Sequence, residues 1–148
     1  GGRVGWQVAR DFADRIERVV LGGVPEGVPL ARLDLDQVRA YVEDGTPVTD
    51  RTTAAYIALT ERVAGNDPRA LFALARGLRE TPPIDPAQAP RQPTLFATGT
   101  LDTNIEGSRA LAAECPDSTF FEIPDRHHFN APGSRAFRQA GITFLAGR

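Results

Sequence analysis

Two residues in the second half of the sequence have the types and the spacing needed for acid–base chemistry. Asp102 lies four residues beyond the apolar stretch 94–98, and His128 lies five residues beyond the apolar stretch 119–123. A histidine with a carboxylate behind it can accept a proton from a nucleophile and later return that proton to a leaving group. The carboxylate selects the useful tautomer because it accepts the hydrogen bond from Nδ1. We therefore expect Asp102 and His128 to form an acid–base pair.

Strands must bring these two residues to the same place. The apolar runs 94–98 and 119–123 are short, and helical stretches follow each of them at 105–114 and 136–145. Strands and helices that alternate at these lengths predict parallel pairing through right-handed crossovers. In open parallel sheets, ligands bind beyond the carboxyl ends of the strands. Both polar residues are therefore expected at one common edge of a sheet.

The first half of the chain adds a helix, a strand and a helical block. Apolar residues recur at helical spacing over residues 3–14, at Val4, Val8 and Phe12. Residues 18–23 form an apolar run with a glycine stop, which indicates a strand covered on both faces. A Pro/Gly loop at 24–33 precedes the helical block, and a stiff proline-rich connection at 80–93 follows it. The predicted helices of the block are 34–44, 50–64 and 67–79, with Asp34, Asp50 and Asp67 as N-caps.

Length and composition limit the classes of protein to which the chain can belong. With 148 residues, 41% hydrophobic and 24% charged, the chain has the size and composition of one globular domain. A net charge of −2 provides no basic surface for a nucleic acid. No apolar run approaches the length of a membrane span. The one cysteine, Cys115, cannot form an internal disulfide, so we expect a cytoplasmic protein.

The sequence around the two polar residues resembles the C-terminal third of α/β-hydrolases. In that family the catalytic acid follows a strand in a Gly-x-x-Asp turn, and Gly99-Thr100-Leu101-Asp102 matches that turn. The catalytic histidine of the family often lies in a Pro-Gly-x-x-His-Phe loop, and residues 124–129 are similar to it, with Asp125 in place of the usual glycine. Because the base directly precedes the phenylalanine, the resemblance favours His128 over His127.

The beginning of the chain is similar to the stretch that follows the nucleophile in the same family. The nucleophile elbow is Gly-x-Ser-x-Gly, followed by a helix and a strand with a glycine-rich end. If Gly1 is the last glycine of the elbow, the nucleophile lies two residues before it. Ser108 and Ser134 do not follow a strand, as an elbow serine must. The resemblance therefore implies that the serine is not among the residues of this sequence.

The resemblance implies a fold and an activity. The expected fold class is α/β: residues 1–148 form the C-terminal part of a mostly parallel α/β-hydrolase sheet, with residues 30–79 as an inserted helical lid. The expected activity is hydrolysis of an ester or related acyl bond in a small-molecule substrate. The upstream serine would attack, His128 would act as base and then as acid, and Asp102 would orient His128. No cofactor or metal is implied, and this chain alone is expected to be inactive.

Other interpretations of the same residues stay open. The chain could be a truncated, non-catalytic homologue that acts as an interaction module, because a partial sheet exposes an edge that self-associates or pairs with a missing N-terminal half. Another chain could also supply the nucleophile. Asp102 could be a simple turn residue, and Cys115 fits a small buried hydrophobe better than a reactive thiol. Some aromatic residues could line an acyl pocket or belong to the core: Trp6, Tyr41, Tyr56 and Phe72.

Overall fold

The computed structural model of the chain describes residues 1–24, 27–28 and 30–147. It divides into two compact units, one formed by Gly1–Gly27 with Ile84–Arg148 and the other by Val28–Pro83. The predicted loop at 24–33 includes residues 25, 26 and 29, which lie outside the described residues. Each unit is described below by itself.

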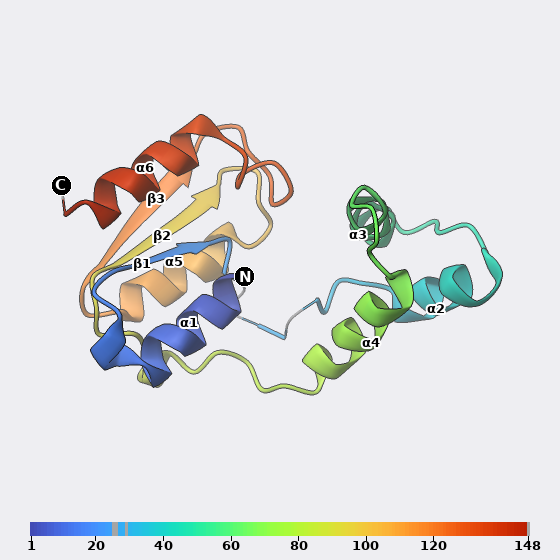
Figure 1. Cartoon of the computed structure of the whole chain (residues 1–148), viewed down its shortest axis with the longest axis horizontal. Coiled ribbons are helices and arrows are strands. Elements are labelled where there is room, and N and C mark those ends of the chain that lie inside the picture. Colours follow the sequence, from blue (N-terminus) through green and yellow to red (C-terminus); the bar gives the residue numbers. More distant parts are fainter. Residues whose placement is uncertain (25–26, 29, 148) are drawn as a thin grey trace. The chain divides into compact units, whose positions relative to one another are not determined.

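The first unit is built around a parallel sheet with the strand order β1-β2-β3 (Figure 1). Its strands are β1 (Val19–Gly22), β2 (Thr94–Gly99) and β3 (Ser118–Ile123). The central strand β2 pairs in parallel with both neighbours, so the carboxyl ends of all three strands lie at one edge. Every residue of β2 is buried, which accounts for the absence of polar alternation in its sequence. The three predicted strands and their parallel pairing are thus confirmed.

Helices cover both faces of this sheet. Figure 1 shows α1 (Gly2–Asp11) and α5 (Ile105–Glu114) on one face and α6 (Arg135–Leu145) on the other. Phe96 of β2 is fully buried on the α1 and α5 side, where its ring meets the Trp6 ring edge-on with 6.3 Å between centroids. The next residue, Ala97, packs with Phe137 of α6 on the opposite face. This alternation follows from the pleat of the strand and gives a three-layer α/β unit, as predicted.

The first helix differs from its prediction in length and in the face that it buries. α1 ends at Asp11, and a 3₁₀ turn (Ala13–Arg15) follows it. Trp6 and Ala9 form its buried face, and a Cβ on Gly5 would lie 2.8 Å from the Leu21 side chain of β1. This close approach needs a small residue at position 5, and Trp6 is the large apolar side chain that the helix buries. The predicted stripe stays exposed, by 66%, 40% and 49% for Val4, Val8 and Phe12.

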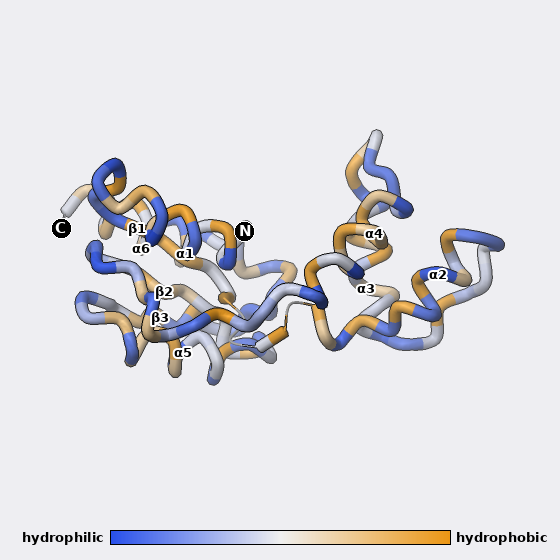
Figure 2. The backbone as a smooth tube through the Cα atoms, turned by 90° about the horizontal axis from the view of Figure 1, so that it is seen from below, coloured by the Kyte–Doolittle hydropathy of each residue, from blue (hydrophilic) through white to orange (hydrophobic). Residues whose placement is uncertain are grey.

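The second unit consists of three helices, as the sequence indicates. They are α2 (Leu35–Asp44), α3 (Arg51–Glu61) and α4 (Pro68–Arg79), and the predicted aspartates cap all three, namely Asp34, Asp50 and Asp67. The Arg79 guanidinium holds the entry of the unit by donating to the carbonyls of Leu30, Ala31 and Leu33. Hydrophobic and hydrophilic positions alternate along these helices (Figure 2).

Among the described helices of both units, none combines the length and hydrophobicity that crossing a bilayer requires. The role of the helical block as a lid stays a prediction.

The proline-rich connection returns the chain to the sheet. Asp85 caps a short 3₁₀ helix (Pro86–Gln88) by accepting from the Ala87 N–H. The buried Gln92 side chain then donates to the Ala9 carbonyl at 2.9 Å, which fixes the start of β2 against α1. The hydrogen bond between the connection and α1 therefore fixes where β2 begins in the sheet.

Candidate active site

Asp102 and His128 meet at the carboxyl edge of the sheet. His128 Nδ1 lies 2.9 Å from Asp102 Oδ2. The side chain of Asp102 is 1% exposed, whereas that of His128 is 37% exposed, so the carboxylate is shielded and the imidazole can be reached. An ionised carboxylate can only accept a hydrogen bond, so with Asp102 ionised the contact requires Nδ1 as the donor and leaves the lone pair of a neutral ring on Nε2. This pair can take up a proton at Nε2 and stabilise the imidazolium that forms.

A tight turn after β2 places the Asp102 carboxylate. The Asp102 N–H donates to the Gly99 carbonyl at 3.0 Å, and Asp102 Oδ1 accepts from the Asn104 N–H at 2.9 Å. The latter contact is an Asx turn, which leads the chain into α5. The two carboxylate oxygens therefore have separate tasks, since Oδ1 holds the turn and Oδ2 meets His128. Asp102 is therefore both a turn residue and the partner of His128.

The histidine loop is fastened to the same turn. The Leu101 N–H donates to the Arg126 carbonyl at 2.9 Å, and the Asp125 N–H donates to Thr100 Oγ1 at 2.9 Å. Gly99 permits this contact, because a Cβ there would lie 2.0 Å from the Arg126 carbonyl oxygen. Asp125 has a φ of 55°, a conformation that favours glycine and that aspartate tolerates. The positive φ at this position explains why the family usually has glycine here and why aspartate can replace it.

His127 has a different role from His128. Its Nδ1 accepts from the Phe129 N–H at 3.2 Å, and its backbone N–H donates to Asn130 Oδ1 at 2.8 Å. The side chain of His127 thus closes the loop on itself, while His128 reaches Asp102. Within the described residues, no group of three or more His, Cys, Asp or Glu side chains is arranged to hold a metal ion.

Two neighbours of the pair were not found from the sequence. Gly23, just after β1, has a φ of 54°, and a Cβ there would lie 3.0 Å from His128 Nδ1 and 3.1 Å from Asp102 Oδ2. Asn104 Nδ2 lies 3.4 Å from His128 Nδ1. In the sequence, Gly23 indicates only the end of a strand. The parallel order of the sheet is the signal that could have placed it beside the pair, because β1 ends at the same edge.

The remaining candidate side chains have structural partners. Ser108 is fully buried in α5, and its Oγ donates to the Val24 carbonyl at 2.7 Å. Ser134 caps α6 by accepting from the Phe137 N–H. Burial raises the pKa of the Cys115 thiol to about 11, with a smaller contribution from the charge of Glu114. Cys115 therefore stays protonated near neutral pH, which fits a small buried hydrophobe.

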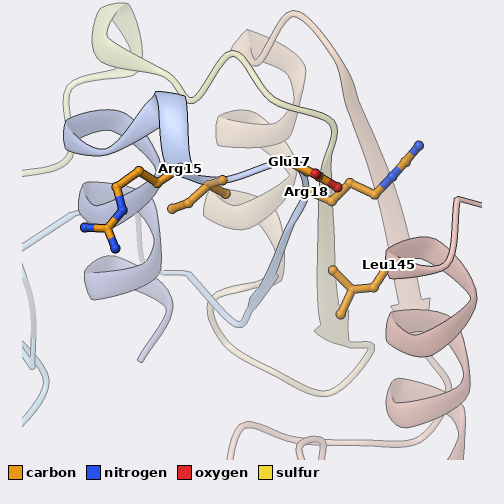
Figure 3. Close-up of a pocket in the computed structure, with 5 residues that line it drawn as sticks. Arg15, Glu17, Arg18 and Leu145 are labelled. Atoms are coloured by element: carbon orange, nitrogen blue, oxygen red, sulfur yellow. The ribbon is translucent and has the colours of Figure 1, made fainter.

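A hollow of about 330 Å³ lies at the other end of the sheet unit. Its lining residues precede β1 or end α6: Arg15, Ile16, Glu17, Arg18 and Leu145 (Figure 3). The side chains of Arg15 and Arg18 point to opposite sides in Figure 3, so they do not converge on one ligand. Binding sites need polar groups that converge. This hollow therefore provides no candidate binding site.

Comparison with known proteins places this geometry in a known fold. No family model and no curated protein matches the chain. The chain is similar to the enol-lactonase from Burkholderia xenovorans, with a TM-score of 0.73, 20% identity, and coverage of 98% of this chain and 62% of that chain. The fold is that of an α/β-hydrolase.

Two further solved structures agree with this α/β-hydrolase fold. An esterase from Thermogutta terrifontis has a TM-score of 0.70 and 21% identity, with coverage of 99% of this chain and 61% of that chain. A hydrolase from Pseudomonas aeruginosa has a TM-score of 0.67 and 21% identity, with coverage of 98% and 61%. The chain thus spans about three fifths of the length of these structures. The expected α/β-hydrolase fold is confirmed, and the roles of Asp102 and His128 are argued from their geometry.

Substitution of Gly99 tests how the two halves of the site are joined. Gly99→Ala should lower the free energy of unfolding by about 1–3 kcal/mol, the usual cost of overpacking, because the new methyl group meets the Arg126 backbone. Gly133→Ala is the matched control, since a Cβ at Gly133 has nothing within 4 Å, and its effect should stay within about 0.5 kcal/mol. Urea unfolding followed by circular dichroism measures both. Equal effects of the two variants would contradict the described contact.

Proposed function

We propose that the chain supplies the acid and the base of a hydrolase that cleaves an ester or a related acyl bond. The observation that carries the proposal is the contact of 2.9 Å between Asp102 Oδ2 and His128 Nδ1 at the carboxyl edge of an α/β-hydrolase sheet. The solved structures that share the fold include an enol-lactonase and an esterase, which supports this class of substrate.

In the proposed reaction, His128 Nε2 removes the proton from a serine hydroxyl while the serine oxygen attacks the carbonyl carbon. The same nitrogen then gives the proton to the departing oxygen, and water repeats the sequence to release the acid. Asp102 keeps Nδ1 protonated and offsets the positive charge of the imidazolium. Each step therefore needs the Nδ1–H tautomer of His128.

We place the serine two residues before Gly1 in the whole protein, from the resemblance of the first residues to the end of a nucleophile elbow. The packing of α1 supports this placement. A Cβ on Gly2 would lie 2.9 Å from the Gly22 carbonyl oxygen and 2.9 Å from the Val24 side chain. Gly23, between those two residues, lies against His128 and Asp102. The first turn of α1 therefore starts at the same edge of the sheet as the pair.

The helical unit Val28–Pro83 is proposed as the lid of this hydrolase. It is inserted between β1 and β2, two strands that are neighbours in the sheet. Its helices α3 and α4 and the turn between them expose apolar side chains, namely Leu59, Val63, Leu71 and Leu74, by 40%, 56%, 38% and 55%.

An interaction module is the second candidate function, because the sheet unit exposes an apolar flank. In the described part of the chain, β1 is an outer strand and pairs on one side with β2. Trp6 packs toward Phe96 of β2, so the stripe of Val4, Val8 and Phe12 lies on the flank of α1 that faces away from β2. The free edge of β1 and the exposed stripe are therefore two surfaces of the sheet unit that a partner could cover.

The proposed occupant of the flank is the part of the α/β-hydrolase sheet that this chain does not supply. The match to the enol-lactonase covers 98% of this chain but 62% of that structure, so about two fifths of the enol-lactonase has no counterpart here. Exposed strand edges and apolar patches associate with whatever can cover them. In the absence of that part, copies of the chain are expected to use the flank to associate with one another.

Activity of the complete protein tests the proposed catalytic roles. With an intact serine elbow, Asp102→Asn should lower kcat for a p-nitrophenyl ester by about 10³–10⁴-fold, because control of the tautomer is lost. His128→Ala should be at least as damaging. His127→Ala is the matched control, and it should change kcat by less than about tenfold because its ring holds only the loop.

The chain itself should not turn over the ester above its own His128→Ala variant. Turnover above that background would contradict the upstream position of the nucleophile. A start codon directly before Gly1 in the reading frame, with no Gly-x-Ser-x sequence upstream, would instead favour the interaction module.

Self-association of the chain tests the apolar flank. Val8→Asp and Phe12→Asp should each shift the chain toward the monomer in sedimentation equilibrium, because a charge replaces buried apolar contact. Leu145→Asp is the matched control, since Leu145 is exposed to a similar extent, by 55% against 40% for Val8 and 49% for Phe12, but lies on α6. Dissociation by Leu145→Asp alone would place the contact on α6 and contradict the proposed flank.

A further inference from the structure

A tight corner at the end of β1 lies against the Asp102–His128 pair. Gly23 occupies this corner with a φ of 54°, and its N–H donates to the Ala97 carbonyl at 3.1 Å. A Cβ on Gly23 would lie about equally close to His128 Nδ1 and Asp102 Oδ2, at 3.0 and 3.1 Å. The Gly23 backbone therefore covers the hydrogen bond between the two side chains, and it helps to keep Asp102 at 3% exposure.

The next residue anchors this corner in the core. Val24 is fully buried, and its carbonyl accepts the hydroxyl proton of Ser108 at 2.7 Å. Ser108 lies in the interior of α5 and is also fully buried. A serine inside a helix usually bonds to the carbonyl of the preceding turn. This one bonds to a carbonyl 84 residues away in the sequence, so it joins α5 to the end of β1.

The corner has little freedom on its other side. The start of α1 packs against it so closely that a Cβ on Gly2 would lie 2.9 Å from both the Gly22 carbonyl oxygen and the Val24 side chain. Without the Ser108 hydroxyl, the buried Val24 carbonyl loses a donor, and a buried carbonyl without its donor is driven toward water. Because α1 blocks one direction, relaxation of the corner takes place on the side that includes Asp102 and His128.

We infer that Ser108 is a positioning residue for the Asp102–His128 pair and acts through the backbone of Gly23 and Val24. The inference rests on the roles proposed above for the pair, but it concerns the shielding of their hydrogen bond, which exists without a substrate. Ser108 holds the corner in place, and the corner excludes water from the Asp102 carboxylate. The hydrogen bond that this carboxylate accepts from His128 Nδ1–H is stronger where water is excluded.

The test compares Ser108→Ala with Ser118→Ala in the 148-residue chain. Ser118 is a matched control because its Oγ also donates to a backbone carbonyl, that of Ala112, at 2.6 Å, but it lies at the start of β3, away from the pair. The readout is the low-field proton resonance of His128 Nδ1–H, assigned by its loss in Asp102→Asn. Both serine variants should lower the Tm. Only Ser108→Ala should speed exchange of the Nδ1 proton with water, by at least about tenfold because shielding is lost.

The inference is overturned if the exchange rate in Ser108→Ala equals that of the unchanged chain, or if Ser118→Ala accelerates exchange as much. Should Ser108→Ala fail to fold, Ser108→Cys keeps the size of the side chain with a much weaker donor and should show the same acceleration. Ser108→Thr keeps the hydroxyl and should restore slow exchange.

Activity separates this inference from the proposed function. In the complete protein, Ser108→Ala should lower kcat with KM unchanged. If Asp102→Asn abolishes activity while Ser108→Ala leaves kcat intact, the proposed function stands and the inference fails. If proton exchange responds to Ser108→Ala but Asp102→Asn retains full activity, the inference on shielding stands and the proposed function fails.

Discussion

The hydrogen bond between the buried Asp102 carboxylate and His128 Nδ1 places demands on segments from the whole sheet unit. The turn after β2 must present one carboxylate oxygen while the other holds the backbone of Asn104. The loop after β3 must cross that turn within hydrogen-bonding distance, which is possible because residue 99 is glycine. The end of β1 must cover the contact without a side chain, which is why Gly23 stands there. Burying a carboxylate costs free energy unless its oxygens accept hydrogen bonds. Loss of any one of these contacts therefore destabilises the whole arrangement.

Features that depend on local sequence were predictable. The apolar runs predict the three strands, and the aspartates at the helix starts predict the N-caps. Because Asp102 and His128 each follow a strand, the sequence also predicts that they meet at one edge of the sheet. These features follow from neighbouring residues and from the common direction of parallel strands. The preference for His128 over His127 came from a family resemblance, and the contact with Asp102 agrees with it.

Features that depend on packing between distant segments were not predictable. α1 buries Trp6 and Ala9, glycines stand where the helix comes close to β1, and the predicted apolar stripe stays exposed. Ser108 and Gly23 acquire their roles from contacts with residues about 80 to 100 positions away in the sequence, which no local pattern encodes. The proposed hydrolase would account for both the exposed stripe and the acid–base pair, because the solved structures that share the fold extend beyond the part that this chain covers.

The most direct test of the account is the tautomer of each histidine, measured by ¹H–¹⁵N correlation spectra of the ¹⁵N-histidine-labelled chain at pH 8. The two adjacent residues should have opposite tautomers. His128 should carry its proton on Nδ1, because Asp102 accepts there, and His127 should carry its proton on Nε2, because its Nδ1 accepts from the Phe129 N–H. Asp102→Asn should change the spectrum of His128 and leave that of His127. A proton on Nε2 of His128 in the unchanged chain would contradict the central claim.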